Sequence, residues 1–362
     1  MSPRTAILSY ALGTGHTRVA QVLAGQLAGL GHACDHRPLE EWITWDYDLL
    51  FRRGYLLLAL RFPAGWEAMY RSPRFARRDG LGLALMRPRA WKRFGKLGLG
   101  DYDLVAATQY NALEVASDWK TNTGRSLPLA CVITDYDIYP LWARRAADLF
   151  LVAHEDLAAP LERLGVSRGR IRAPGIPVAP AFHEPQDPLR TRAGLGLRED
   201  RPVALVFGGG VGAGPMESCI RSALDARGWQ VVAVCGRNEG LRRRLVPLAQ
   251  EEPARLRVLG YRGDVAALMS ASDVVITKGG GLSLTEALYT GARVVAMPSL
   301  PGQERANIDF MTARGWLEAC DDPRDLRGLL EGHGERERRA CPLPPEPART
   351  AAALLHQLAG RS

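Results

Sequence analysis

The alternation of short apolar runs with helical stretches is the feature that most restricts how this chain can fold. Runs typical of buried strands occur at 5–11, 102–108, 127–135 and 147–154, and a second series follows at 202–210, 229–236, 256–261, 273–278 and 291–298. Amphipathic stretches such as 17–31 lie between runs, a pattern typical of parallel α/β sheets. The sequence therefore predicts an α/β protein with two Rossmann-like halves.

A proline-rich segment separates the two series. Residues 172–188 contain five prolines, which is too many for a regular element. We expect an N-terminal domain over 1–175, a C-terminal domain over 176–335, and a mobile tail with a closing helix over 336–362. The carboxyl ends of both sheets would then face each other across a cleft, where such folds usually bind ligands.

The composition narrows the class of protein. With 46% hydrophobic and 24% charged residues over 362 positions, the chain is typical of a soluble globular protein. Its six cysteines lie far apart, so we expect no disulfide scaffold, no zinc or other metal site, and a cytoplasmic location. The first run is broken by Gly and His, unlike a signal peptide. No run approaches the roughly 20 apolar residues of a membrane span.

Glycines crowd the end of the run at 202–210, where a helix is expected to follow. Glycines let backbone N–H groups approach an anion, and a helix N-terminus adds a favourable dipole. The candidate residues of this phosphate loop are Gly208, Gly209, Gly210, Gly212 and Gly214. A plain tight turn is the simpler alternative.

A dinucleotide-binding fingerprint is a further alternative. It requires an acid at the end of the next strand, but that strand ends at Cys235-Gly236-Arg237. The first loop, with Gly13 and Gly15, has Asp35 downstream, but Arg18 stands where a small residue belongs. NAD is therefore disfavoured at both sites.

A second glycine loop, Gly279 to Gly281, opens a helix near Leu282. Glu286 lies one turn into this helix, where its carboxylate could accept the two hydroxyls of a ribose. Gln303, Glu304 and Asn307 follow on a loop and first turn, and all can bond sugar hydroxyls. Glu286 alone would more often be a solvated helix residue, but its neighbours favour a sugar-nucleotide site.

Six segments, in this order, resemble glycosyltransferases of the monogalactosyldiacylglycerol synthase and processive diacylglycerol glucosyltransferase family, of the family 28 type. They are GTGH (13–16), VITDYDIYPLW (132–142), GIPVAPAF (175–182), GGGVGAGP (208–215), TKGGGLSLTEAL (277–288) and PGQERAN (301–307). The group is related to the peptidoglycan enzyme that adds N-acetylglucosamine to a lipid precursor. The resemblance covers residues 5–320, more loosely between 42 and 100, and implies the GT-B fold with a UDP-sugar donor and no other cofactor.

The resemblance also implies roles for single residues. The diphosphate would face the two glycine loops, Gly208 to Gly212 and Lys278 with Gly279, Gly280, Gly281 and Leu282. Glu286 would hold the ribose, Gln303 and Glu304 the hexose, and the backbone at Tyr261 and Arg262 the uracil. His16 and Asp135 would meet the acceptor, beside Gly13 and Gly15.

His16 suits the chemistry that this resemblance implies. A lipid hydroxyl that attacks an anomeric carbon must lose its proton as the bond forms, and near pH 7 a histidine can accept it. Asp135 could fix the histidine tautomer and stabilise the imidazolium. The glycine loops could stabilise the leaving UDP without a metal, and a single displacement would invert the anomeric centre. A surface or helix-capping role is the simpler alternative for a lone histidine.

The chain departs from the family pattern in two loops. Tyr136 to Tyr139 stand where the family usually has one or two histidines before the Pro140 segment, which leaves the acceptor open. Gly279 stands where the family usually has proline, which suggests a softer donor loop.

Basic and aromatic residues are interleaved between residues 49 and 100. This segment contains twelve Lys or Arg and two acids, so its net charge is +10, whereas the net charge of the whole chain is +8. This mixture suits an anionic membrane surface. A solvated basic face is the alternative, and no nucleic-acid motif accompanies the segment, so we expect no nucleic-acid partner. The residues expected at the membrane or lipid acceptor are Arg52, Arg53, Trp66, Arg77, Arg78, Trp91, Lys92 and Arg93.

These observations predict an inverting, peripheral enzyme on the inner face of the cell membrane that transfers a hexose from a UDP-sugar to diacylglycerol or a similar lipid. The alternatives are a polyprenyl-linked or other lipid acceptor, and an inactive nucleotide-sugar- or lipid-binding protein. A dehydrogenase is a more distant third. The sugar stays open among glucose, galactose and an N-acetylhexosamine.

Overall fold

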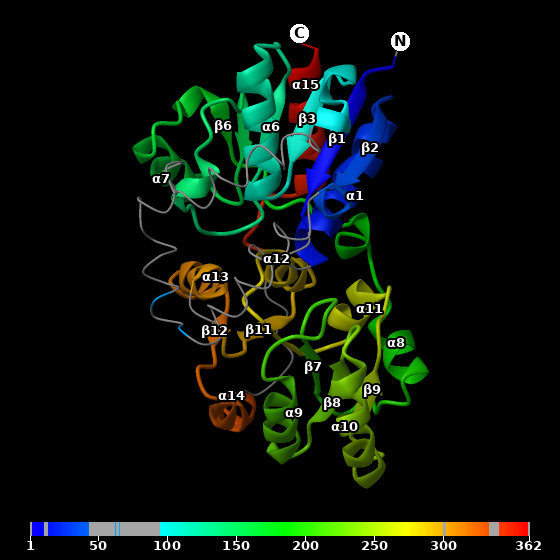
Figure 1. The fold of residues 1–362 in the computed structure, drawn as a ribbon. Coiled ribbons are helices and arrows are strands. Elements are labelled where there is room, and N and C mark those ends of the chain that lie inside the picture. Colours follow the sequence, from blue (N-terminus) through cyan, green and yellow to red (C-terminus); the bar gives the residue numbers. More distant parts are fainter. Residues whose placement is uncertain are drawn as a thin grey trace. The chain divides into compact units, whose positions relative to one another are not determined.

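The computed structural model describes residues 2–10, 14–42, 62, 65, 95–299, 302–332 and 340–360. The chain forms two compact units (Figure 1). The first unit comprises 1–179, 300–302 and 344–362, and the second comprises 180–299 and 303–343. Within the described residues each unit contains one six-stranded parallel sheet. This confirms the predicted α/β class with two parallel sheets.

The first sheet has the strand order β2-β1-β3-β4-β5-β6. Ile7 at its centre pairs with His36 of β2 and Ala106 of β3. The strand order reverses at β1, so the connections that leave β1 and β3 run in opposite directions, and parallel sheets usually bind ligands at the carboxyl ends of such strands. The strands are β1 (Arg4–Ser9), β2 (Ala33–Pro38), β3 (Leu104–Ala107), β4 (Leu129–Val132), β5 (Leu149–Leu151) and β6 (Ile171–Arg172).

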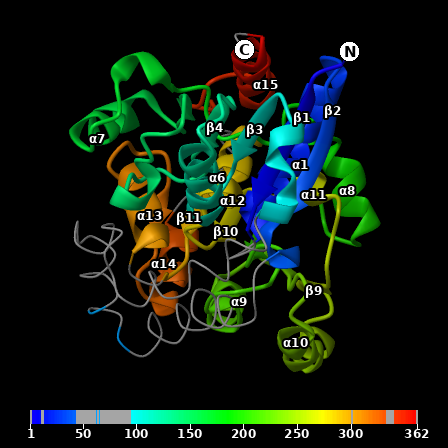
Figure 2. The same ribbon diagram turned by 45° about the horizontal axis from the view of Figure 1, so that its top comes forward.

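The first unit has four α-helices within its described residues. They are α1 (Thr14–Gly29), α6 (Tyr110–Thr123), α7 (Ala158–Arg163) and α15 (Pro347–Ala359). Gln109 caps α6 by accepting from the amides of Asn111 and Ala112, and the helix stops at Gly124, whose φ is 65°. The C-terminal helix α15 packs against α1, and Figure 2 shows it among the elements of this unit.

The second sheet has the strand order β12-β11-β10-β7-β8-β9. Val206 pairs with Ile276 of β10 and Ala233 of β8, and all three are fully buried. Here the strand order reverses between β7 and β10. The strands are β7 (Val203–Phe207), β8 (Gln230–Val234), β9 (Leu256–Leu259), β10 (Val274–Thr277), β11 (Arg293–Ala296) and β12 (Glu318–Ala319).

Seven α-helices are described in the second unit. They are α8 (Pro188–Gly194), α9 (Met216–Asp225), α10 (Glu239–Glu251), α11 (Val265–Ser270), α12 (Gly281–Tyr289), α13 (Gln303–Thr312) and α14 (Leu326–Glu331). The buried side chain of Arg192 connects α8 to the segment that precedes β10. It donates to the carbonyl of Ala271 at 2.7 Å and to the carboxylate of Asp273 at 2.9 Å. The chain after the prolines therefore packs with the second unit.

The proline-rich segment is largely irregular. Residues 173–187 contain neither an α-helix nor a strand, and only one 3-10 turn at Pro180–Phe182. Residues 336–339 of the tail lie outside the described residues, and from Ala340 the chain leads into α15. Among the helices that the structure describes, none combines the length and apolar character that crossing a bilayer requires.

Candidate functional site

His16 lies in the first turn of α1, at the reversal point of the first sheet. Its Nδ1 is 2.9 Å from the carbonyl oxygen of Thr108, which follows β3, and 2.8 Å from the hydroxyl of Thr134, which follows β4. A carbonyl can only accept, so in the contact to Thr108 the proton sits on Nδ1. In the neutral ring Nε2 then keeps the lone pair and is the basic nitrogen.

Thr108 and Thr134 were not anticipated from the sequence. Thr108 also donates from its hydroxyl to the carbonyl of His16 at 3.0 Å, which joins the start of α1 to the end of β3. Asp135, next to Thr134, is 2% exposed. The Thr108 carbonyl accepts from Nδ1 of His16, and the contact expected between Asp135 and His16 stays a prediction. The signal for both threonines was their position after a buried strand.

The two glycine loops of the second unit lie side by side. The first follows β7 and the second follows β10, the neighbouring strands between which the order of this sheet reverses. A Cβ atom added at Gly209 would be 3.4 Å from Cε of Lys278, so the Lys278 side chain lies close to the first loop. Parallel sheets bind ligands at such a reversal, outside the carboxyl ends of the strands.

The first loop is fastened to the turn that follows β8. Gly212 has a φ of 63°, and a Cβ there would lie 2.0 Å from the carbonyl oxygen of Cys235. The carbonyl of Gly212 accepts from Nδ2 of Asn238 at 2.9 Å, and the carbonyl of Gly210 accepts from the amide of Arg237 at 3.0 Å. Asn238 also caps α10. Asn before a helix is a recognisable signal, but its bond to the loop required the structure.

The second loop is packed against α13. A Cβ at Gly279 would lie 2.4 Å from the carbonyl oxygen of Glu304 and 2.9 Å from Cδ1 of Ile308. Asn307 is fully buried and donates to the carbonyl of Gly279 at 2.9 Å. The expectation that Asn307 bonds sugar hydroxyls is therefore wrong, because its side chain holds the loop. The packing also argues against a softer loop at Gly279.

The helix α12 begins directly after this loop, and no side chain caps its N-terminus. Gly280 is the N-cap and makes no side-chain bond, and the first amides of a helix have no intrahelical partner. Lys278 and Glu304 form an ion pair beside it. Glu286 is 6% exposed on α12, and Leu282 is buried, so the Leu282 side chain belongs to the core.

Tyr261 and Arg262 follow β9, at the same edge of the sheet. Tyr261 is 55% exposed. The Arg262 guanidinium bonds both carboxylate oxygens of Asp264, at 2.8 and 2.5 Å, and lowers the pKa of that carboxyl. Arg262 is therefore held by an acid, whereas the Tyr261 ring lies against the guanidinium of Arg237.

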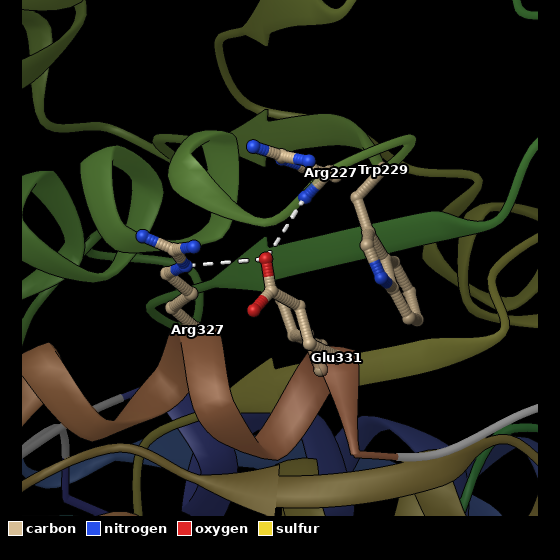
Figure 3. Close-up of a pocket in the computed structure, with 5 residues that line it drawn as sticks. Arg227, Trp229, Arg327 and Glu331 are labelled. Carbon is tan, nitrogen blue, oxygen red and sulfur yellow. Dashed lines mark hydrogen bonds and ion pairs between the residues drawn. The ribbon is translucent and has the colours of Figure 1, made fainter.

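A separate pocket of about 500 Å³ lies at the opposite edge of this sheet (Figure 3). In it Glu331 accepts from the amide of Arg227 at 3.3 Å and from Nε of Arg327 at 3.1 Å, beside Trp229. Trp229 precedes β8, whereas the glycine loops follow their strands, and five residues of strand span about 16 Å. This pocket is therefore distinct from the candidate donor site.

Several expected residues lie outside the described part of the chain. They are Gly13 and the membrane or acceptor candidates Arg52, Arg53, Trp66, Arg77, Arg78, Trp91, Lys92 and Arg93. Gly15 is described and lies in the first turn of α1. Across the described residues, no three His, Cys, Asp or Glu side chains gather in a way that could hold a metal ion.

The chain is similar to known glycosyltransferases. Residues 203–308 match the glycosyltransferase family 28 C-terminal domain, and residues 103–178 match monogalactosyldiacylglycerol (MGDG) synthase. The processive diacylglycerol beta-glucosyltransferase of Bacillus subtilis (strain 168) is 30% identical over 325 residues, which are 86% of this chain and 82% of that protein.

Two solved structures share the fold. MurG of Acinetobacter baumannii has a TM-score of 0.62 at 15% identity, over 98% of this chain and 100% of that one. Alr3699/HepE of Anabaena, in complex with UDP-glucose, has a TM-score of 0.53 at 14% identity, over 99% and 98%. Together with the two parallel sheets, these likenesses confirm the predicted GT-B fold.

Proposed function

The chain belongs to the family of the processive diacylglycerol β-glucosyltransferases, and on that premise we propose how it transfers a hexose from a UDP-sugar to diacylglycerol. It is a UDP-sugar-dependent hexosyltransferase, as the sequence predicted. The observation that best supports the proposed donor site is that the two glycine loops follow β7 and β10, the neighbouring strands between which the order of the second sheet reverses.

The donor binds to the second unit in this proposal. The diphosphate lies against the glycine loops and the uncapped N-terminus of α12, where amides and the helix dipole favour anions. Glu286 accepts from the ribose hydroxyls, and Gln303 and Glu304 bond the hexose. Tyr261 lies against the uracil.

His16 acts as the general base. As the acceptor hydroxyl attacks the anomeric carbon, Nε2 takes its proton, the bond between that carbon and the β-phosphate oxygen breaks, and UDP leaves with the electron pair. UDP-glucose is α-linked, so the β product named for the relatives requires inversion. The buried carboxylate of Asp135 stabilises the imidazolium. A positioned base contributes roughly 10²–10⁴-fold to the rate.

Two further points extend the proposal. Amides of the glycine loops, with Lys278, supply the positive field that a leaving diphosphate requires, so transfer proceeds without a metal ion. The basic and aromatic segment at 49–100 draws the enzyme to the anionic inner face of the membrane, where diacylglycerol is available.

The test is UDP release from UDP-glucose, UDP-galactose and UDP-N-acetylglucosamine, with diacylglycerol in anionic vesicles, for the wild type and His16→Ala. We expect acceptor-dependent release from one donor, a loss of at least 10²-fold in the variant, and no effect of EDTA. Donor binding without release from any of the three would contradict diacylglycerol as the acceptor. Inhibition by EDTA that added Mg²⁺ reverses would contradict the metal-free step.

A further inference from the structure

Arg237 lies directly against the phosphate loop, although no sequence motif assigned it a role. It follows β8, the strand next to β7, and its amide donates to the carbonyl of Gly210 at 3.0 Å. The adjacent Asn238 holds the carbonyl of Gly212. The backbone of residues 237–238 is therefore bound at two points to the loop that is proposed to hold the diphosphate.

The side chain of Arg237 differs from the neighbouring cations in its partner, which is an aromatic ring and not an acid. Its guanidinium carbon lies 5.2 Å from the centroid of the Tyr261 ring. Lys278 is paired with Glu304, and Arg262 with Asp264. Within the described residues, Arg237 has no such ion pair with an acid. Tyr261 keeps this cation at the carboxyl edge of the sheet through a cation–π contact rather than through a neutralising carboxylate.

The charge of the candidate donor site calls for such a cation. Lys278 and Arg262 are each balanced by their acid. A UDP-sugar brings two negative charges on its diphosphate. The guanidinium of Arg237 therefore supplies a positive charge for the diphosphate that no acid neutralises within the described residues. Its planar N–H groups match the spacing of phosphate oxygens.

We propose that Arg237 is a donor-binding residue that contacts the diphosphate of the UDP-sugar, with the Tyr261 ring holding its guanidinium in position. This inference rests on the proposed function, because it takes the glycine loops as the diphosphate site. The same contact stabilises the charge that develops on UDP as it leaves.

The experiment compares three ligands that differ only in phosphate. Uridine, UMP and UDP are titrated calorimetrically into the wild type, Arg237→Ala, Arg237→Lys and the control Arg243→Ala, which removes an exposed arginine of α10. We expect Arg237→Ala to weaken UDP binding by roughly 10–100-fold, the usual worth of hydrogen bonds to a charged group. In the same variant the affinity for UMP should fall less than that for UDP, and the affinity for uridine should fall less than twofold. Arg237→Lys should recover part of the UDP affinity. Arg243→Ala should bind as the wild type does.

The outcomes separate the two proposals. A wild type that binds none of the three ligands overturns the proposed function, and this inference with it. A wild type that binds UDP, with Arg237→Ala equal to it, overturns this inference alone. An equal loss for uridine and UDP also overturns it, since the cation would then contact the nucleoside. Thermal unfolding of each variant identifies any loss that comes from misfolding, and Arg237→Lys then provides the test.

Discussion

Replacing Gly279 by alanine should damage both stability and donor binding, because the space for a Cβ is already filled. The added atom would lie 2.4 Å from the carbonyl oxygen of Glu304 and 2.9 Å from Cδ1 of Ile308. Ordinary C···O contacts begin near 3.3 Å, so the loop or α13 must move by about 1 Å. The obstacle is steric, since Gly279 is not in the left-handed region.

The size of the effect follows from this displacement. Overpacking of this kind costs about 1–3 kcal/mol, which for a unit of this size lowers Tm by roughly 2–12 °C. The movement also displaces Glu304, which pairs with Lys278. A misplacement near 1 Å in a site can cost on the order of 10²-fold in rate, so kcat/KM for the UDP-sugar should fall comparably.

The adjacent Gly280 provides the matched control for stability. A Cβ there would meet only the end of the flexible Lys278 side chain, Nζ at 3.3 Å and Cε at 3.8 Å. Alanine is a weaker N-cap than glycine, but it also restricts the unfolded chain, and these effects of about 0.5–1 kcal/mol oppose each other. Thermal unfolding with and without UDP, together with steady-state kinetics, compares the two variants. Equal Tm for Gly279→Ala and Gly280→Ala, or a wild-type kcat/KM in Gly279→Ala, would refute this reasoning.

Three further changes test other parts of the molecule. Thr134→Val removes the hydroxyl contact of His16 Nδ1 and keeps the Thr108 carbonyl, so kcat should fall only a few-fold; a loss as large as that of His16→Ala would show that the hydroxyl is essential. Glu286→Gln should weaken uridine and UDP alike, by roughly tenfold in calorimetric titrations, because it removes charged bonds to the ribose; an unchanged uridine affinity would argue against that contact. His32 donates to or accepts from His356 at 2.8 Å, and burial, then His356, lowers its pKa below 6.5. The folded chain binds a proton at His32 less readily than the unfolded chain does. The stability that neutral His32 contributes is therefore present above pH 6.5 and lost below it, by at most about 1.4 kcal/mol per pH unit. His32→Asn should reduce the fall of Tm between pH 7.5 and 5.5, and an identical pH profile would contradict this.

Local sequence was sufficient for the class of fold and for the two glycine loops. Continuous apolar runs separated by helical stretches predict parallel strands, because each strand of such a sheet is buried on both faces, as at Val203–Phe207. Glycines at 208–214 and 279–281 were recognisable because a backbone that must approach an anion closely cannot carry side chains. Family resemblance then predicted a UDP-sugar-dependent hexosyltransferase, and the comparison with the Bacillus subtilis enzyme confirmed the family.

Contacts between distant segments required the tertiary structure. Strand order brings Thr108 and Thr134 to His16 across 92 and 118 residues, and no local pattern encodes which strand ends are neighbours. The same holds for the turn after β8 that binds the glycine loop, and for α15, which returns to α1 at the other end of the chain. Asn307 illustrates the reason: its residue type suits a sugar hydroxyl, but its burial against Gly279 decides what it bonds.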